Sequence, residues 1–146
     1  MALEKSLWQR VKTGGKALRA AGHRVMLTRI ENMVDEGTPD VEGCVNSAQI
    51  WLELKSCARP ARARTPIHPK VRPSQADWHR ERTAAGSRYH YVLIQVGEAS
   101  QAKLYLIPGR DYAHIIVPEI DLEILSVLSY TTEPMTQVLL RAARGW

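Results

Sequence analysis

Three side chains in the first half of the chain could together hold a divalent metal ion and neutralise negative charge. Asp40 follows a Gly-Thr-Pro turn at residues 37–39, and Glu53 and Lys55 lie at the end of an apolar run. Mg²⁺ takes carboxylate oxygens as ligands, and a lysine ammonium is a compact positive charge for a phosphate oxygen. Two carboxylates and an ammonium are therefore the set that metal-dependent hydrolysis of a phosphodiester requires.

A predicted β-hairpin would bring these three side chains together. Residues 47–55 alternate between apolar and other positions, which is typical of a strand with one buried face. The apolar positions are Ile50, Leu52 and Leu54. The two charged residues of this strand then share the opposite face. Residues 41–45 predict a second strand that turns back at residues 46–47 and pairs with the first.

The other elements follow from periodicity and from turn residues. A basic amphipathic helix is expected over residues 3–20, weakened or interrupted at Gly14-Gly15. Residues 56–72 contain three prolines and many arginines without periodicity, which predicts a long loop. Pro73 then opens a helix that Gly86 stops. The remaining expected elements are strands over residues 22–30, 89–96 and 103–107 and a last helix over residues 133–143.

Short motifs in the central part of the chain carry a family resemblance. They are Gly37-x-Pro39-Asp40, Trp51-x-Glu53-Leu54-Lys55 and Pro73-Ser74-Gln75-x-x-Trp78. With this spacing they resemble the PD-(D/E)XK nuclease superfamily, and within it the VRR-NUC type and small phage-encoded nucleases, over about residues 29–96. The resemblance implies an α/β fold with a restriction-endonuclease-like core, in which helices flank a central mixed β-sheet. It also implies a metal-dependent DNA endonuclease.

The resemblance assigns a role to each of these residues. Asp40 and Glu53 would supply carboxylates, and Leu54 a backbone carbonyl, to Mg²⁺ or Mn²⁺. Lys55 would assist the attacking water and neutralise a phosphate oxygen. Gln75 matches a glutamine that, in the resembled family, holds a phosphate or the nucleophilic water. The alternative is that Gln75 is only an exposed residue at the start of a helix.

A third acidic ligand is expected from one of two positions. Glu31 lies at the end of the first predicted strand and near the Asp40 turn, and it is the preferred candidate. Members of the resembled family often take this acid from the first helix, which here would be Glu4. A site without a third carboxylate is the remaining alternative.

The charge of the chain favours an acidic polymer as its partner. The 146 residues carry a formal charge of +5, and the sequence pI is about 9.5. No acidic residue lies between Glu53 and Asp77, so this stretch is strongly basic. The residues expected to contact the DNA backbone there are Arg59, Arg62, Arg64, Lys70 and Arg72. The alternative is a loop whose charge serves only solubility.

Several other classes of protein are not supported. The sequence has no apolar run long enough to span a membrane and no signal-peptide core, so a cytoplasmic protein is expected, in a bacterial host cell if the source is a phage. Cys44 and Cys57 form neither a disulfide framework nor a zinc motif. Residues 14–16 lack the spacing of a phosphate-binding loop, so no nucleotide cofactor is expected.

Histidines and tryptophans are expected in surface or packing roles. The five histidines are scattered and show no metal-binding spacing. For His68 and His79 a solvated surface position is favoured over a phosphate contact. Trp51 and Trp78 are expected to pack against the protein, with base stacking as the alternative.

A single nuclease-like domain is expected over residues 1–146, with its core at about residues 22–108. Apolar segments at residues 115–117 and 120–128 exceed what that core needs, which favours a homodimer interface. The resembled type includes structure-specific enzymes such as Holliday-junction resolvases, so branched DNA is the expected substrate. The alternatives are a sequence-specific nicking or homing-type endonuclease, and a non-catalytic DNA-binding protein that retains the nuclease fold.

Overall fold

A six-stranded mixed sheet forms the centre of the computed structural model, which describes residues 2–30, 37–130 and 135–146. Its strands are β1 (Val25–Arg29), β2 (Val41–Val45), β3 (Ala48–Cys57), β4 (His90–Val96), β5 (Lys103–Pro108) and β6 (Leu128–Tyr130). They lie in sequence order across the sheet, and all neighbours are antiparallel except β3 and β4. This parallel pair requires a crossover connection, which contains α2 (Pro73–Ala84).

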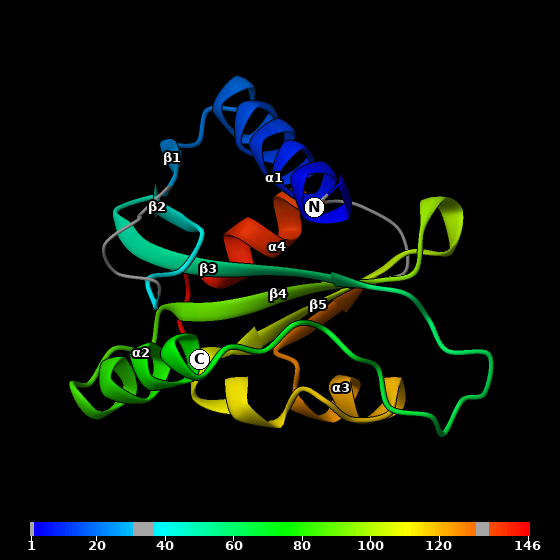
Figure 1. The fold of residues 1–146 in the computed structure, drawn as a ribbon. Coiled ribbons are helices and arrows are strands. Elements are labelled where there is room, and N and C mark those ends of the chain that lie inside the picture. Colours follow the sequence, from blue (N-terminus) through cyan, green and yellow to red (C-terminus); the bar gives the residue numbers. More distant parts are fainter. Residues whose placement is uncertain (1, 31–36, 131–134) are drawn as a thin grey trace.

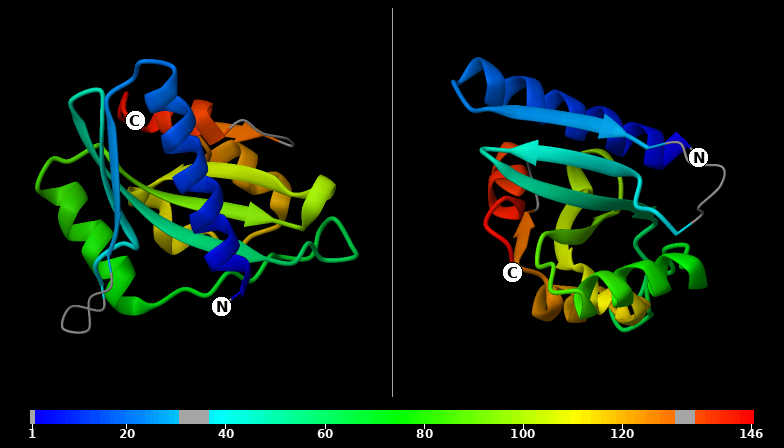
Figure 2. Two further views of the ribbon diagram at one scale, coloured as in Figure 1. Left: turned by 90° about the horizontal axis from the view of Figure 1, so that it is seen from above. Right: turned by 90° about the vertical axis from the view of Figure 1, so that its left-hand side faces the viewer.

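Helices cover both faces of the sheet (Figure 1, Figure 2). The first face carries α1 (Ala2–Ala20) and α4 (Met135–Ala142), and the second carries α2 and α3 (Glu119–Leu125). Two 3₁₀ helices, η1 (Ala99–Gln101) and η2 (Gly109–His114), flank β5. The predicted α/β fold class with helices around a central mixed sheet is confirmed, and it is consistent with a restriction-endonuclease-like core. None of the helices in the described residues is long and apolar enough to cross a membrane.

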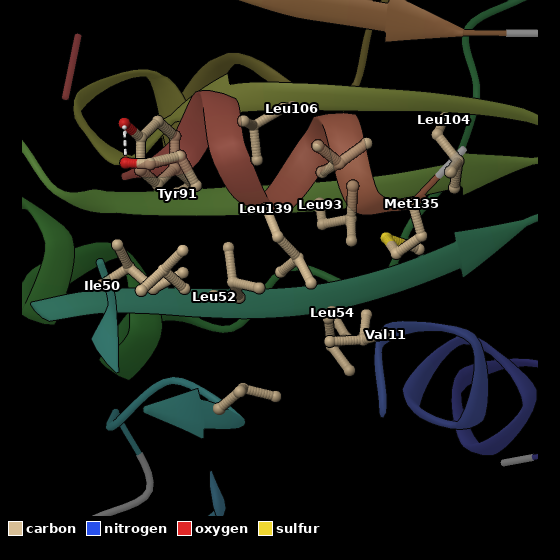
Figure 3. Packing of buried hydrophobic residues seen from close by; sticks show 14 of the residues in the cluster. Val11, Ile50, Leu52, Leu54, Tyr91, Leu93, Leu104, Leu106, Met135 and Leu139 are labelled. Atoms are coloured by element: carbon tan, nitrogen blue, oxygen red, sulfur yellow. Dashed lines mark hydrogen bonds between the residues drawn. The ribbon is translucent and has the colours of Figure 1, made fainter. Parts of the chain in front are cut away.

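The larger hydrophobic core lies between the sheet and the layer formed by α1 and α4 (Figure 3). The alternating apolar residues of β3 all enter it, namely Ile50, Leu52 and Leu54. The last helix contributes Met135, Val138, Leu139 and Ala142. In addition, the Tyr91 hydroxyl donates to the Ala142 carbonyl at 2.8 Å. The C-terminal helix, beyond the predicted core at residues 22–108, is therefore part of this core.

The second core lies on the opposite face, under α3 and η2. It includes Ile115 and Leu122, both 0% exposed, from the apolar segments that predict a dimer interface. By contrast, Ile116, Ile120 and Ile124 are 45%, 68% and 80% exposed. Part of the apolar C-terminal sequence is thus used inside the fold, whereas these three isoleucines are exposed.

The β2–β3 hairpin forms as the sequence predicts. Val41 pairs with Leu52 in antiparallel register. Asn46 and Ser47, between the strands, have positive φ angles of 47° and 78°. Such angles are required by the tight turns whose twist matches that of paired strands. The hairpin brings Asp40, which precedes β2, alongside the second half of β3.

The first helix is more regular than the sequence predicts. Gly14 and Gly15, expected to weaken or interrupt it, lie inside a continuous helix. A Cβ atom on Gly14 would lie 2.8 Å from Cγ of Met135, and one on Gly15 would lie 2.8 Å from Cδ1 of Leu27. The glycines therefore allow α4 and β1 to approach α1 closely. This packing outweighs their poor helix propensity, which costs about 1 kcal/mol each relative to alanine.

The crossover helix α2 begins and ends at the residues that the sequence indicates. Pro73 occupies its first position, and Gly86, just beyond its end, has a φ angle of +102°. The long loop before this helix is anchored by Ile67, which is 0% exposed. The backbone N–H of Ile67 donates to the carbonyl of Val117 at 3.0 Å. The basic loop is thus attached to the fold near its middle.

Candidate active site

Lys55, Glu53 and Gln75 form a buried hydrogen-bonded cluster between β3 and α2. The Lys55 ammonium donates to Oε1 of Gln75 at 2.9 Å, and Nε2 of Gln75 donates to Oε2 of Glu53 at 2.8 Å. The Lys55 nitrogen also lies 3.7 Å from the same Glu53 oxygen. The amide thus contacts a cation through its oxygen and an anion through its nitrogen, which only one orientation of the amide allows.

The two charged residues of this cluster are more buried than the sequence suggests. Glu53 is 1% exposed and Lys55 is 3% exposed. The alternating pattern predicts a strand with one buried face, but both faces of β3 are covered, because α2 and η2 pack over the side that carries the charges. A buried ion pair is stable only when hydrogen bonds satisfy both partners. Gln75, itself 5% exposed, provides one hydrogen bond to each partner.

Tyr112 of η2 completes the cluster. Its hydroxyl donates to Oε1 of Gln75 at 2.5 Å and accepts from the backbone N–H of Arg72 at 3.3 Å. The Lys55 nitrogen lies 5.8 Å from the centre of its ring. Burial, and after it the negative charge of the nearby carboxylates, raises the pKa of Tyr112 above its usual range. The phenol is therefore a neutral hydrogen-bond donor at physiological pH.

Asp40 directly precedes β2 and is held between Ile30, which follows β1, and Leu54 of β3. Its Oδ2 accepts from the backbone N–H of Leu54 at 2.8 Å, and its own carbonyl accepts from the N–H of Ile30 at 2.7 Å. Gly37 lets the preceding turn contact α2, because a Cβ atom there would lie only 2.5 Å from the carbonyl oxygen of Ser74. Asp40 is half-buried, so it is more accessible than the charged residues beneath α2.

Asp40, Glu53 and the Leu54 carbonyl are the groups of this site that could hold a Mg²⁺ or Mn²⁺ ion. The N–H and C=O groups of one strand residue face the same side, so the Leu54 carbonyl faces the side where Asp40 lies, and Glu53 adjoins it. Mg²⁺ is usually bound through one or two carboxylates together with water and substrate phosphate. In the part of the chain that the structure describes, no three His, Cys, Asp or Glu side chains could hold a metal together. The predicted third ligand, Glu31, lies outside the described residues, as does the side chain of Glu4.

Two buried histidines, His79 and His90, stack in series against the Tyr112 ring. His79 lies one helical turn after Gln75, and its ring stacks on Tyr112 with centroids 5.2 Å apart. Its Nδ1 is 2.8 Å from Nδ1 of His90. Burial, then the neighbouring histidine and Lys55, lowers the pKa of His79 to about 3, and burial also lowers the pKa of His90 to about 4. The expected surface position of His79 is wrong, because it is on the inner face of α2 and 1% exposed.

The hydrogen bonds of Thr83 assign the tautomers of these two rings. Oγ1 of Thr83 donates to the His79 carbonyl at 2.8 Å, so it accepts from Nε2 of His90, which is 3.2 Å away. His90 then accepts at Nδ1, and His79 donates from its own Nδ1. Nε2 of His79 is buried and meets no hydrogen-bond partner among the described residues. Both rings are therefore neutral, and their stack fixes the position of the Tyr112 ring.

Of the basic residues predicted to contact DNA, Arg59 is already engaged by the fold. Its Nε and Nη2 donate to the two carboxylate oxygens of Glu119 at 2.6 and 2.9 Å. Its Nη1 donates to the carbonyl of Gln101 at 2.7 Å. The hydrogen bond from Arg59 lowers the pKa of Glu119, so the carboxylate stays ionised. The charge of Arg59 is thus largely neutralised.

The other four predicted DNA-binding residues are exposed. Arg62 and Arg64 line a cavity of about 710 Å³ beside β5 and α3. Lys70 follows in the returning part of the loop. Arg72 directly precedes α2, and its backbone contact with Tyr112 places it next to the buried cluster. Figure 1 shows the loop running out beyond the end of β3 and returning beneath the sheet to α2.

A second cavity, of about 570 Å³, lies at the beginning of β3. We call it the Trp51 pocket; its lining residues are Asn46, Ser47, Ala48, Gln49, Trp51, Arg82, Ser87 and Tyr89. The guanidinium carbon of Arg82 lies 5.3 Å from the centre of the Trp51 ring and 4.9 Å from that of Trp78. The centroids of the two indole rings are 5.4 Å apart. Both tryptophans therefore pack as expected, but Trp51 also borders the cavity.

The sequence does not predict Tyr112 as part of the buried cluster, nor His79 and His90 as the residues packed against it. One signal was present, because His79 follows Gln75 at a spacing of four residues, which places both on one face of a helix. Tyr112 carried no comparable signal. It reaches the cluster only because η2 packs against α2.

Comparison with known proteins adds no assignment. No protein-family model matches the chain, and no curated protein matches it with significance. The resemblance to the PD-(D/E)XK superfamily therefore stays a hypothesis carried by its motifs.

Proposed function

We propose that this protein is a metal-dependent DNA endonuclease whose active site contains Asp40, Glu53, Lys55 and Gln75. The observation that carries the proposal is the convergence of two carboxylates, an ammonium and an amide from three separate segments of the chain. Keeping a lysine buried beside a glutamate is costly, and such arrangements cluster at functional sites. Phosphodiester hydrolysis is the reaction for which this set of groups is suited.

Each residue has a defined task in the proposed reaction. Asp40, Glu53 and the Leu54 carbonyl would hold Mg²⁺ or Mn²⁺. When bound, the ion would supply Lewis-acid stabilisation of phosphate charge and a lowered pKa for water. Lys55 would neutralise an oxygen of the scissile phosphate as charge develops there. Gln75 would hold the ammonium in position through its 2.9 Å hydrogen bond.

A second candidate function follows from the burial of the charged pair. Glu53 and Lys55 are 1% and 3% exposed, so a phosphate can reach them only if the residues above them move. A purely structural ion pair would need no such movement. The second candidate is therefore a DNA-binding protein that retains a nuclease-like arrangement without turnover.

The proposed substrate is branched DNA, such as a flap or a four-way junction. Arg62, Arg64, Lys70 and Arg72 are accessible and would contact the phosphate backbone, which gives affinity that falls steeply with salt. Arg59 is excluded from this set because of its paired hydrogen bonds with the fold. Such an enzyme would act in the cytoplasm, of a bacterial host if the protein is phage-encoded.

A homodimer is also part of the proposal, because it would place two active sites on two DNA strands. Ile120 and Ile124 lie one turn apart on α3 and are 68% and 80% exposed. Exposed aliphatic side chains at this spacing form a continuous apolar stripe that a second copy could cover.

Cleavage assays with matched variants test the proposed activity. The purified protein would be incubated with Mg²⁺ or Mn²⁺ and labelled single-stranded, duplex, flap and four-way-junction DNA. Cutting should fall at least about a hundredfold in Glu53→Gln and Lys55→Ala. The controls are Glu42→Gln and Lys16→Ala, which change side chains outside the cluster. Cutting that persists in both active-site variants would contradict the proposal, and metal-independent DNA binding without cutting would favour the second candidate.

A further inference from the structure

The side chains around the Trp51 pocket have the chemistry of a nucleotide-binding surface. Tyr89 offers an aromatic ring that is 38% exposed. Gln49 and Asn46 bring amide groups, and none of the lining residues is acidic. The volume of about 570 Å³ lies within the range of roughly 300–1,000 Å³ that is typical of small-molecule sites.

Arg82 provides a positive charge in this pocket. Its guanidinium packs over two indole rings, and no carboxylate of the described residues lies within salt-bridge distance of it. By contrast, Arg80 on the same helix is bound to Asp77 at 2.8 Å. A half-buried guanidinium without a carboxylate partner attracts an anion, and phosphate matches its planar set of donors. The pocket therefore contains both the guanidinium of Arg82 and the exposed aromatic ring of Tyr89.

The pocket and the candidate active site share one face of β3. Trp51, Glu53 and Lys55 alternate along that strand, so Trp51 lies about 7 Å from Glu53. α2 borders both places, because Gln75 lies near its first turn and Arg82 near its last. Since a stacked DNA strand rises by about 3.4 Å per nucleotide, a nucleotide roughly two positions from the scissile phosphate would reach the pocket.

We propose that the Trp51 pocket binds one unpaired nucleotide of a DNA strand next to the cleavage position. The base would stack on Tyr89, because the Trp51 ring is already covered by Arg82, and a phosphate of the same strand would bind Arg82. The inference rests on the proposed function and specifies its substrate as DNA with a single-stranded nucleotide beside the cut. Stacking on an aromatic ring tolerates any base, so this pocket selects DNA structure and not sequence.

DNA binding in the absence of metal tests this inference separately from catalysis. The full-length protein in EDTA would be titrated into a fluorescein-labelled oligothymidylate and into a blunt duplex of the same length, with fluorescence anisotropy as the readout. Tyr89→Ala should weaken oligothymidylate binding roughly 5- to 150-fold. Arg82→Gln should weaken it about tenfold or more. Duplex affinity should change little in either variant.

Two control variants separate stacking and phosphate binding from general charge and folding effects. Tyr89→Phe keeps the aromatic ring and should bind oligothymidylate like the wild type. Arg80→Gln removes the same charge from the same helix but outside the pocket, and it should also bind like the wild type. Circular dichroism would verify that each variant is folded. If Arg82→Gln fails to fold, the pair Tyr89→Ala and Tyr89→Phe decides the result.

The outcomes distinguish failure of this inference from failure of the proposed function. Unchanged oligothymidylate affinity in Tyr89→Ala would overturn the pocket assignment alone. Equal displacement by thymidine monophosphate and by oligothymidylate would also overturn it, because the pocket would then be a mononucleotide site. A wild-type protein that binds no DNA would overturn both proposals. If Tyr89→Ala selectively loses single-strand binding and the wild-type protein does not cut DNA with metal, the result would support the pocket assignment and contradict the proposed nuclease activity.

Discussion

The Lys55 ammonium lies 2.9 Å from the side-chain oxygen of Gln75, in the buried layer between β3 and α2. The two residues are 20 positions apart, on a strand and on the crossover helix that follows it. Through its nitrogen, the same amide also holds Glu53. The packing of α2 and the geometry of the candidate active site therefore depend on the same hydrogen bonds.

Replacement of Gln75 with leucine should destabilise the fold by roughly 1–3 kcal/mol. The substitution removes the hydrogen-bond partners of a buried ammonium and a buried carboxylate, and neither group can recover them from water. Urea unfolding would measure the loss. The control Asp77→Ala breaks an exposed ion pair on the same helix and should cost less than about 1 kcal/mol. Equal losses in the two variants would show that the buried amide has no special role.

Tyr112→Phe should reduce DNA cleavage, because the phenol fixes the oxygen of Gln75 that in turn holds Lys55. Loss of one hydroxyl should also cost about 1 kcal/mol of stability. Tyr105→Phe is a matched control, since its buried hydroxyl bonds Glu119 at 2.6 Å, away from the cluster. The control should lose similar stability and keep its activity. A parallel loss of activity in both variants would mean that only stability is affected.

Gly37→Ala should disturb the position of Asp40. A Cβ atom would lie 2.5 Å from the carbonyl oxygen of Ser74, so the turn must move away from α2 at a cost of roughly 1–3 kcal/mol. Gly22→Ala is the comparison, because Gly22 has a φ angle of +98° but a methyl group there would meet no atom within 4 Å. That variant should show backbone strain alone and leave metal-dependent cutting unchanged. Thermal unfolding and cleavage rates would be measured for both.

Stability should fall as the pH is lowered from about 6.5 to 5. The folded-state pKa values of His79 and His90 are about 3 and about 4, well below the value of about 6.5 expected in the unfolded chain. In this range the unfolded state binds protons that the folded state excludes, so acid favours unfolding. The two residues together should cost roughly 2–3 kcal/mol over this interval.

Urea unfolding at a series of pH values would measure this effect. His90→Gln removes one titrating ring while keeping a hydrogen-bonding side chain, so its stability should depend less steeply on pH. A slope unchanged by the substitution would show that the buried pair does not control acid stability.

Ile120→Asp combined with Ile124→Asp should abolish dimer formation if α3 is the interface. The wild-type protein should sediment as a dimer at micromolar concentration, and the double variant as a single chain of 16.4 kDa. Met26→Asp changes another exposed apolar residue, 70% exposed on the edge strand β1, and should leave the dimer intact. A wild-type protein that sediments only at 16.4 kDa would contradict the proposed assembly.

Local features of the sequence were sufficient to predict most of the elements. The alternation around Glu53 reflects the twofold period of a strand, and the β2–β3 turn needs only residues that tolerate positive φ. Pro73 and Gly86 mark the ends of α2 because their backbone preferences are intrinsic. These signals depend on neighbours in the chain, so they can be read without a structure. The motif spacing likewise placed Asp40, Glu53, Lys55 and Gln75 in one hypothesis.

Tertiary packing decided what the alternating pattern left open. The charged face of β3 is buried because α2 and η2, formed by later parts of the chain, pack over it. Gly14 and Gly15 remain helical because Met135 and Leu27 fill the space beside them. Arg59 is held by the carboxylate of Glu119, which is 60 residues away in the sequence. The sequence by itself thus determined most of the elements and the reactive residue types. Burial and hydrogen-bond partners depend on contacts between distant segments, which no local pattern encodes.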